Sequence, residues 1–365
     1  MGPPQHYKRC LVMAGGGFRL GIYLGMHAAA CEAGRAPEVV LASCGGAIAA
    51  ALVHSVTDPL AQKAWLASPE MHRFWCSIRP AAGAAIHRAL WGAARRALTR
   101  QPAPRIPDVF TDHLFELPQG LPALPAPGQP TGPDVALVGS RLLFTEAEVG
   151  QLRGTRKLFE EVVFCGPRAA GLLQGMPSPF NHPRWGNTAV APEVAVDTAM
   201  PLDEAVRVSV TDMYYFTSHR RGAQHYLGGV VDLFPIEVAH RLAEEVAIEF
   251  KAPFDQGASV PAWRAVLGVD ANQRLRHVHA QRADVWIDSS DVGTVLGGQR
   301  FRREFAWRQN RLRLAPPTDY AQYVSHIEAQ WRYGHQRARE AYARAATAPR
   351  PSMRLANRFN LAPGG

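Results

Sequence analysis

Short apolar runs and glycine-rich breaks alternate along the N-terminal part of the chain. Residues 9–14 form an apolar run that predicts a buried strand, and three consecutive glycines end it. An apolar, alanine-rich stretch at 20–33 predicts a buried helix that stops at Gly34. A second strand is predicted at 38–43 and a second buried helix at 45–54. This order predicts a parallel βαβ unit with a right-handed crossover.

Beyond this unit the pattern predicts helices and strands in a less regular order. Helices are expected at 59–100, from Pro235 to about 250, and at 319–346. Residues 101–133 are rich in Pro and Gly and predict a long loop or lid. Further strands are expected at 135–138, 162–165, 206–210, 229–231 and 284–288.

Together these elements predict one α/β domain over residues 8–345. We expect a three-layer α/β/α sandwich with a mainly parallel central sheet. Residues 52–200 are expected to supply helices and the Pro- and Gly-rich loop over the site. Residues 346–365 are expected to form a disordered tail.

The composition fits a large folded domain and adds a strong positive charge. The chain has 365 residues, of which 47% are hydrophobic, enough to bury a large core. The formal net charge is +9, and most of the basic residues are Arg. Basic residues are more frequent after Arg264, in the part of the chain that contains Trp307 and Trp331. No nucleic-acid-binding motif accompanies them. We therefore expect an anionic membrane surface or an acidic carrier protein as partner, and no nucleic acid, although codon bias would also enrich Arg.

Cysteine usage indicates reduced thiols. The cysteines are irregularly spaced and form no Cys-x-x-Cys pair; they are Cys10, Cys31, Cys44, Cys76 and Cys165. We therefore expect no disulfide framework, no metal site and no cofactor. The N-terminal residues lack a signal-peptide pattern, and no apolar run is long enough to span a bilayer. The expected location is the cytoplasm, with peripheral attachment to a membrane as an alternative.

A glycine-rich loop follows the first predicted strand. Consecutive glycines at Gly15, Gly16 and Gly17 allow backbone N–H groups to point together at an oxyanion or a phosphate, with a helix dipole behind them. A dinucleotide site would need an acidic residue at the end of the second strand, where Ser43 and Cys44 stand instead. A tight turn that only glycine can adopt is the alternative explanation.

The second strand ends in a sequence typical of a nucleophile elbow. The segment Ala42-Ser43-Cys44-Gly45-Gly46 matches Gly-x-Ser-x-Gly in shape, with small residues two positions before and after the centre. Small flanking residues permit the sharp turn that lifts the central side chain out at the start of a helix. The central residue in this register is Cys44.

The order of glycine loop, helix and elbow resembles the patatin-like phospholipase family. A further match to this family lies at residues 226–235, which read Tyr-Leu-Gly-Gly-Val-Val-Asp-Leu-Phe-Pro. The resemblance implies a patatin-like fold and hydrolysis of lipid acyl esters by a Ser–Asp dyad, with the glycine loop binding the oxyanion. It assigns the oxyanion role to the three loop glycines and Arg19. It also places Cys44 at the serine position and Leu227 at the aspartate position, so both side chains of the dyad differ.

These two departures leave two hypotheses open. A thiol at the start of a helix has a lowered pKa and needs less help from a base. Cys44 would then be the nucleophile of a hydrolase or acyltransferase acting on lipid acyl esters or acyl thioesters, with His225 and Asp232 as candidate bases. Alternatively, the protein is an inactive pseudoenzyme that binds an acyl group or serves as a scaffold.

Overall fold

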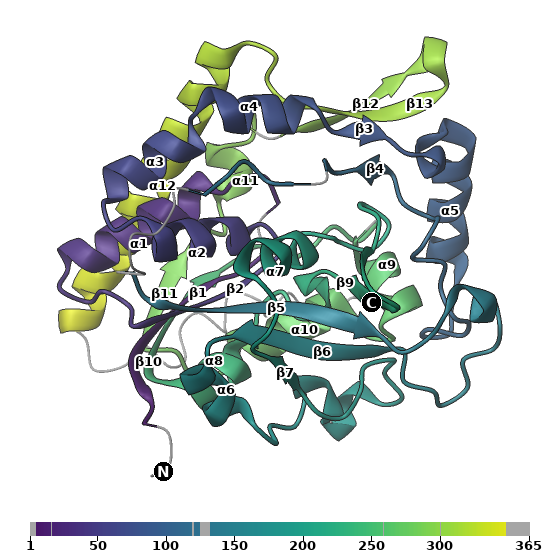
Figure 1. Cartoon of the computed structure of the whole chain (residues 1–365), viewed down its shortest axis with the longest axis horizontal. Coiled ribbons are helices and arrows are strands. Elements are labelled where there is room, and N and C mark those ends of the chain that lie inside the picture. The colour runs from purple at the N-terminus through teal and green to yellow at the C-terminus, as the bar shows by residue number, and fades with distance from the viewer. Residues whose placement is uncertain are drawn as a thin grey trace, which may run out of the picture.

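A nine-stranded mixed sheet runs through the centre of the molecule (Figure 1). The computed structural model describes residues 5–347, apart from 16, 119, 125–131, 258 and 300. The strands of the central sheet are β1 (Tyr7–Met13), β2 (Val39–Ser43), β5 (Asp134–Leu142), β6 (Phe159–Cys165), β7 (Ala195–Asp197), β8 (His219–Arg221), β9 (Gln224–Leu227), β10 (Ala243–Phe250) and β11 (Val285–Asp288). Their order is β11-β10-β1-β2-β5-β6-β7, and β9 pairs with β5 and β8.

The centre of this sheet is parallel. Strand β1 pairs in parallel with β2 and β10, β10 pairs with β11, and β2 pairs with β5. The antiparallel pairs join β5 with β6 and β9, and β8 with β9. Every residue of β2 is buried, as expected for a parallel strand covered on both faces.

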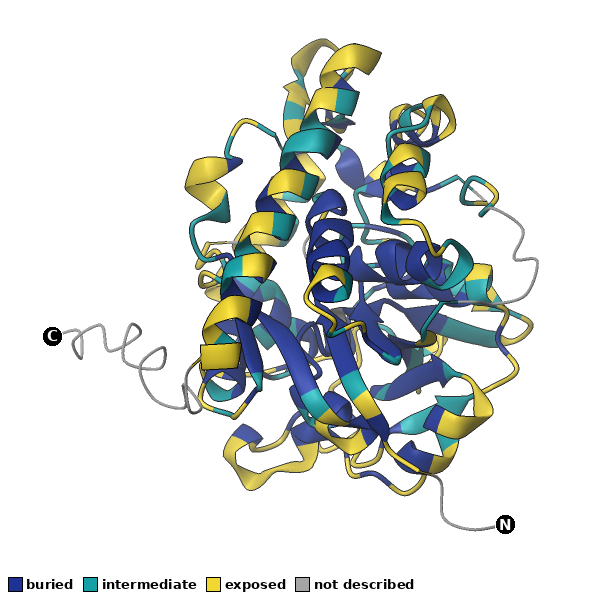
Figure 2. Cartoon of the chain, turned by 90° about the vertical axis from the view of Figure 1, so that its left-hand side faces the viewer, coloured by how far each residue is buried: buried dark blue, intermediate teal, exposed yellow. Residues whose placement is uncertain are grey.

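Helices cover both faces of the sheet. They are α1 (Gly21–Glu32), α2 (Gly46–Ser55), α3 (Pro59–Leu66), α4 (Pro69–Cys76), α5 (Ile86–Leu98), α6 (Pro167–Leu173), α7 (Leu202–Ser209), α8 (Ile236–Leu242), α9 (Ser259–Val266), α10 (Ala271–His279), α11 (Val292–Val295) and α12 (Tyr320–Thr347). One core contains side chains of α1, α2, α7 and α12, and the other contains those of α6, α8, α9 and α10. In Figure 2 the strands are mostly buried, whereas the long outer helix α12 keeps an exposed face. The predicted three-layer α/β/α fold is confirmed.

Two small antiparallel pairs lie outside the central sheet. They are β3 (Arg79–Pro80) with β4 (Phe115–Glu116), and β12 (Arg302–Ala306) with β13 (Arg311–Ala315). The β12–β13 hairpin projects at the top of Figure 1. The sequence pattern predicts neither pair.

The predicted βαβ unit is confirmed, because β1, α1, β2 and α2 follow one another within a residue or two of their expected bounds. The expected helical region 59–100 contains α3, α4 and α5. The strand at 284–288 and the final helix at 319–346 also correspond to β11 and α12.

Three predicted elements are wrong. Residues 206–210 belong to α7 and the turn after it, because Val206, Val208 and Val210 alternate as in a strand but follow acidic residues at a helix start. Residues 229–231 form a 3-10 turn. The helix after Pro235 ends at Leu242, and β10 occupies the rest of the expected helix, between β1 and β11.

The long loop and the tail are described only in part. Among the described residues of 101–133, only β4 is a named strand or helix, and 119 and 125–131 lie outside the described residues. Helix α12 continues to Thr347, two residues into the expected tail, and 348–365 lie outside the described part of the chain. None of the helices in the described ranges combines the length and apolar character needed to cross a bilayer.

The turn between β2 and α2 depends on close contact between backbones. A Cβ atom on Gly46 would lie 1.9 Å from the carbonyl oxygen of Met13, and one on Gly45 would lie 2.3 Å from that of Gly17. Neither carbonyl belongs to a flexible side chain that could move away. The first strand, the glycine loop and the elbow therefore pack together only if these positions lack side chains.

We predict that Gly46→Ala destabilises the protein by about 3 kcal/mol, because the added methyl group overlaps the β1 backbone. Chemical denaturation of both proteins measures this difference. The control is Gly293→Ala in α11, where a Cβ atom meets nothing within 4 Å. That substitution should leave stability unchanged or raise it by up to about 1 kcal/mol. Equal effects of the two substitutions would contradict the packing described here.

Candidate active site

Four neighbouring strands end at the same edge of the sheet and place polar groups there. Gly15 lies just after β1, Cys44 directly after β2, Lys251 directly after β10 and Ser289 directly after β11. Ligands of open parallel sheets bind outside the carboxyl ends of the strands. This edge is therefore the place to look for chemistry.

Cys44 occupies a strained turn. Its φ angle is 50°, in the left-handed region that a side chain other than glycine rarely adopts. The Cys44 N–H group donates to Ser209 Oγ at 3.0 Å, and the Ser209 hydroxyl donates to the Val138 carbonyl at 2.7 Å. A Cβ atom on Gly229 would lie 2.9 Å from the Cys44 nitrogen, so this glycine lets the neighbouring segment close on the turn. The local geometry is that of the predicted elbow.

A carboxylate faces the sulfur, although no acidic residue stands at the expected position. The Cys44 thiol donates to Asp212 Oδ2 at 3.1 Å. Asp212 lies three residues beyond the end of α7, in a turn that its carbonyl holds by accepting from the N–H groups of Tyr215 and Phe216. The other carboxylate oxygen, Oδ1, is buried and has no hydrogen-bond partner among the described residues. Asp212 therefore presents an acceptor with spare capacity next to a thiol.

Burial dominates the protonation of this pair. It raises the pKa of Asp212 to about 7, although the hydrogen bond from Cys44 opposes the shift. Burial, and then the charge of Asp212, raise the pKa of the Cys44 thiol well above its ordinary value. The Gly45 N–H group and Lys251 act in the opposite direction with smaller effect.

The expectation that the start of α2 acidifies the thiol is therefore wrong. The Gly45 amide does favour the thiolate, but burial and the Asp212 carboxylate outweigh it. The sulfur holds its proton at neutral pH, while the carboxylate beside it is poised to accept one.

The glycine loop lies beside the elbow, but its first amide is already bonded. The Gly15 N–H group donates to the Leu233 carbonyl at 3.3 Å. Gly17 is exposed, with a φ angle of 64°. The Arg19 guanidinium donates to the Leu296 carbonyl at 3.2 Å. Gly16 lies outside the described residues.

Lys251 binds the backbone of this loop from the protein interior. Its ammonium group donates to the Gly15 carbonyl at 2.7 Å and to the Tyr23 hydroxyl at 3.0 Å. It also pairs with the buried Glu249 carboxylate at 3.0 Å. Ser289 donates a short hydrogen bond to the same carboxylate. A buried polar cluster thus connects the ends of β10 and β11 to the glycine loop.

The segment around Leu227 contributes packing. Leu227 ends β9, is buried, and belongs to the same apolar cluster as Cys44. Gly228 follows it and donates from its N–H group to the Thr211 carbonyl at 2.6 Å. This bond places the strand end beside the turn that carries Asp212. Leu227, which the family resemblance places at the aspartate position, is therefore apolar. The carboxylate of Asp212, from the adjacent segment, lies against the sulfur instead.

The two candidate bases lie in other surroundings. The His225 ring packs edge-on against Phe110, with centroids 5.0 Å apart, and its Nδ1 lies 3.4 Å from Ser218 Oγ. Asp232 is fully buried and forms an ion pair with Arg274 at 2.8 Å. Among the described contacts, none joins either side chain to Cys44.

Sequence reasoning missed Asp212, Ser209 and Lys251. The sequence pattern places Ser209 in a predicted strand, Asp212 in the loop after it and Lys251 after a predicted helix. The available signal was an acidic residue in a predominantly buried stretch. Within the described ranges, no group of three or more His, Cys, Asp or Glu side chains is arranged to hold a metal ion.

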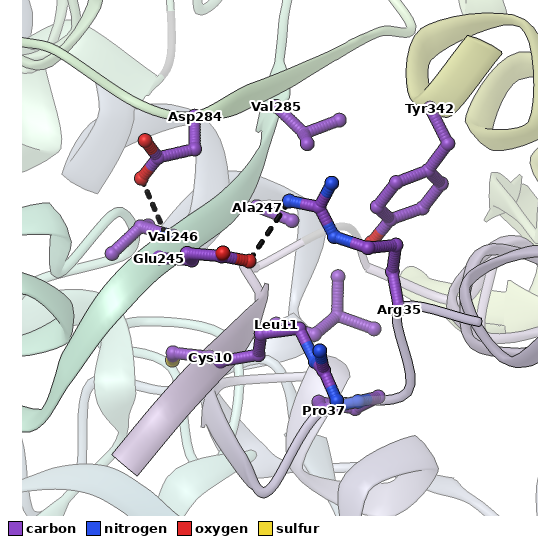
Figure 3. Close-up of a pocket in the computed structure, with 11 residues that line it drawn as sticks. Cys10, Leu11, Arg35, Pro37, Glu245, Val246, Ala247, Asp284, Val285 and Tyr342 are labelled. Carbon is purple, nitrogen blue, oxygen red and sulfur yellow. Dashed lines mark hydrogen bonds and ion pairs between the residues drawn. The ribbon is translucent and has the colours of Figure 1, made fainter. Parts of the chain in front are cut away.

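A pocket lies elsewhere on the sheet (Figure 3). It opens between Cys10, Tyr342 and the ion pair of Arg35 with Glu245, whose atoms are 2.8 Å apart. Cys10 pairs with Val39 at the start of β2. Val39 lies about 16 Å along this strand from Cys44. The pocket therefore faces away from the carboxyl ends of the strands.

Sequence comparison gives no relatives: no protein-family model matches the chain, and no curated protein matches it. Among solved structures, the chain is similar to the crystal structure of VipD from Legionella pneumophila, with a TM-score of 0.34 and 12% sequence identity. The match covers 92% of this chain and 67% of VipD. The function of this protein must therefore be argued from its own residues.

We predict that Asp212→Asn gains stability relative to the wild type as the pH rises from 5.5 to 8. The Asp212 carboxyl has a pKa of about 7 in the folded protein, so its stabilising protonated form is lost as the pH rises from about 4 to 7. Asparagine has no charge to bury. Urea unfolding should show the difference between the two proteins changing by about 2 kcal/mol over this interval.

The control for this measurement is Asp203→Asn, a change at an exposed acid of α7. It should alter the free energy of unfolding by about 0.5 kcal/mol or less at both pH values. If Asp212→Asn followed the same flat course, the Asp212 carboxyl would not be buried as described.

Proposed function

We propose that this protein cleaves or transfers acyl groups from esters or thioesters, with Cys44 as the nucleophile and Asp212 as its base. The observation that carries the proposal is the thiol-to-carboxylate hydrogen bond of 3.1 Å at a strained strand-to-helix turn. A nucleophile with a base in hydrogen-bond reach is the minimum arrangement for acyl transfer.

The protonation states favour general-base catalysis. Asp212, in its carboxylate form, takes the thiol proton while Cys44 Sγ forms a bond to the acyl carbon and the carbonyl electron pair moves onto oxygen. When the tetrahedral intermediate collapses, the bond to the leaving oxygen or sulfur breaks and Asp212 returns the proton to that atom. The product is an acyl thioester on Cys44, which water or another acceptor then attacks with Asp212 again as base.

The backbone near the elbow supplies the candidate oxyanion donors. The Gly15 amide is bonded to Leu233, so we assign this role to the Gly17 amide, on the exposed part of the loop beside Gly45. The Arg19 guanidinium donates to the Leu296 carbonyl, so we assign it the role of holding the loop in position. Lys251 sets the same position from the other side.

The surroundings of the sulfur suit an apolar acyl chain. Cys44 belongs to an apolar cluster that includes Met213, Leu227 and Leu233. A Cβ atom on Gly15 would lie 2.3 Å from the Leu233 side chain and 3.3 Å from Cys44 Cβ, so leucine and cysteine both border this glycine. We therefore propose lipid acyl esters or acyl thioesters as the substrate class.

The second candidate function is an inactive protein that binds an acyl group or serves as a scaffold. Two observations favour it: Cys44 is only 6% exposed, and the Gly15 amide is already bonded. Acylation of the protein distinguishes the two candidates.

We predict that short acyl esters and thioesters acylate Cys44. Intact-mass analysis should show one acyl group on the wild type and none on Cys44→Ala. Asp212→Asn should form the same adduct about 10²- to 10⁴-fold more slowly, because the variant has lost its general base. Cys76→Ala is the matched control, since Cys76 is an exposed thiol outside the site, and it should behave as the wild type does. Labelling that persists in Cys44→Ala would refute the assignment of the nucleophile, and no adduct from any donor would favour the scaffold.

We also predict the pH dependence of this acylation. The rate should rise with pH and level off above about 7, because Asp212 must lose its proton to act as base. In Asp212→Asn the rate should instead keep rising beyond pH 9, since reaction then depends on the ionisation of a thiol whose pKa burial has raised. Stopped-flow or quenched mass measurements between pH 5 and 10 test this. Profiles of the same shape in both proteins would show that Asp212 is not the base.

A further inference from the structure

Large apolar side chains are exposed on helix α5 and on the β12–β13 hairpin. On α5, Trp91 is 72% exposed and Leu98 is 80% exposed. On the hairpin, Trp307 is 72% exposed and stacks on Phe305, with ring centroids 5.1 Å apart. Of the α5 residues, only Ile86 is buried, so most of this helix faces solvent.

The two elements meet at the edge of the molecule. The Ile86 N–H group donates to the Asn310 carbonyl at 3.1 Å, and Ala85 forms a β-bridge with Arg311. Asn310 belongs to the turn of the hairpin, so the turn lies beside the start of α5. Figure 1 shows the hairpin at the top and α5 next to it on the right.

Arginines accompany the exposed apolar residues. On α5, Arg88, Trp91, Arg95 and Leu98 follow one another at intervals of three and four residues, which places them along one stripe of the helix. Arg308 is exposed in the hairpin turn next to Trp307. We call the set of Arg88, Trp91, Arg95, Leu98, Trp307 and Arg308 the aromatic–basic edge.

We propose that the aromatic–basic edge docks on the surface of an anionic lipid bilayer. A helix with Trp and Leu among arginines, lying along the surface of the protein, is typical of interfacial membrane binding. Tryptophan favours the headgroup region, and arginine is attracted to anionic headgroups. Exposed leucine on the same stripe favours lipid over nucleic acid, because a nucleic-acid backbone offers no apolar layer to bury it.

The base of the hairpin lies close to the candidate active site. Phe301, next to β12, stacks on Phe18 of the glycine loop with ring centroids 4.5 Å apart and an interplanar angle of 23°. Phe18 also contacts Tyr215, just beyond Asp212. A bilayer bound at the edge would therefore lie near the loop beside Cys44, although the docking itself does not require the proposed chemistry.

The test is flotation of the full chain with vesicles. The wild type should bind vesicles of phosphatidylcholine with about 30% phosphatidylserine, bind neutral phosphatidylcholine vesicles at least tenfold more weakly, and release the anionic vesicles in high salt. The double variant Trp91→Ala/Trp307→Ala should bind more than tenfold more weakly. Arg88→Gln/Arg308→Gln should bind anionic vesicles about 25-fold more weakly, from roughly fivefold for each arginine.

Two controls separate the edge from other causes. Arg332→Gln/Arg339→Gln removes the same charge from exposed positions of α12 and should bind as the wild type does. Cys44→Ala should also bind normally, so a failure of the proposed chemistry leaves this test intact. Absence of vesicle binding, equal losses in both arginine pairs, or binding to duplex DNA that the edge variants weaken would each overturn the proposal.

Discussion

The site depends on one unfavourable backbone conformation, the left-handed turn at Cys44. A side chain in this region costs on the order of 1–2 kcal/mol, which glycine would avoid. The turn is held because Ser209 binds the Cys44 amide and because Gly45 and Gly46 let two backbones approach it. A protein that needed only the turn would be more stable with glycine at position 44. The presence of cysteine at this position therefore favours the proposed use of its sulfur.

The environment of the turn determines which mechanism the proposed nucleophile could follow. A thiolate formed in advance would need positive groups to outweigh burial, yet Lys251 and the Gly45 amide only reduce the effect of burial and of Asp212. A thiol that keeps its proton until attack needs a base of suitable pKa instead. Asp212 meets that need because its pKa of about 7 lets it gain and lose a proton near neutrality. The same burial that disfavours a free thiolate thus also raises the pKa of the proposed base.

Local sequence could identify the elbow, because a strand, a small-residue turn and a helix are contiguous there. The α/β fold was accessible for the same reason, from the repeat that begins with β1. The contact of Asp212 with Cys44 could not be predicted from the sequence, because it depends on how α7 packs against the sheet. The hydrogen bond from Cys44 to Ser209 at the end of α7 joins residues 165 positions apart in the chain. The alternating valines of α7 predict a strand instead of a helix. The helix signal at Pro235 extends over β10, so the sequence does not place Lys251 at the end of a strand.

The glycine loop is held from both of its sides, and this has a consequence for access to the sulfur. Inside the protein, Lys251 holds the Gly15 carbonyl. On another side, the Phe18 ring contacts those of Trp75 and Phe301, with centroid distances of 5.4 and 4.5 Å, and these two rings also contact each other. Under the proposed function, a substrate would have to displace part of this loop or pass beside it, because Cys44 is nearly buried. The two contacts differ in kind, because Lys251 holds the loop while paired with the buried Glu249 carboxylate, whereas Phe18 holds it through ring contacts with apolar neighbours.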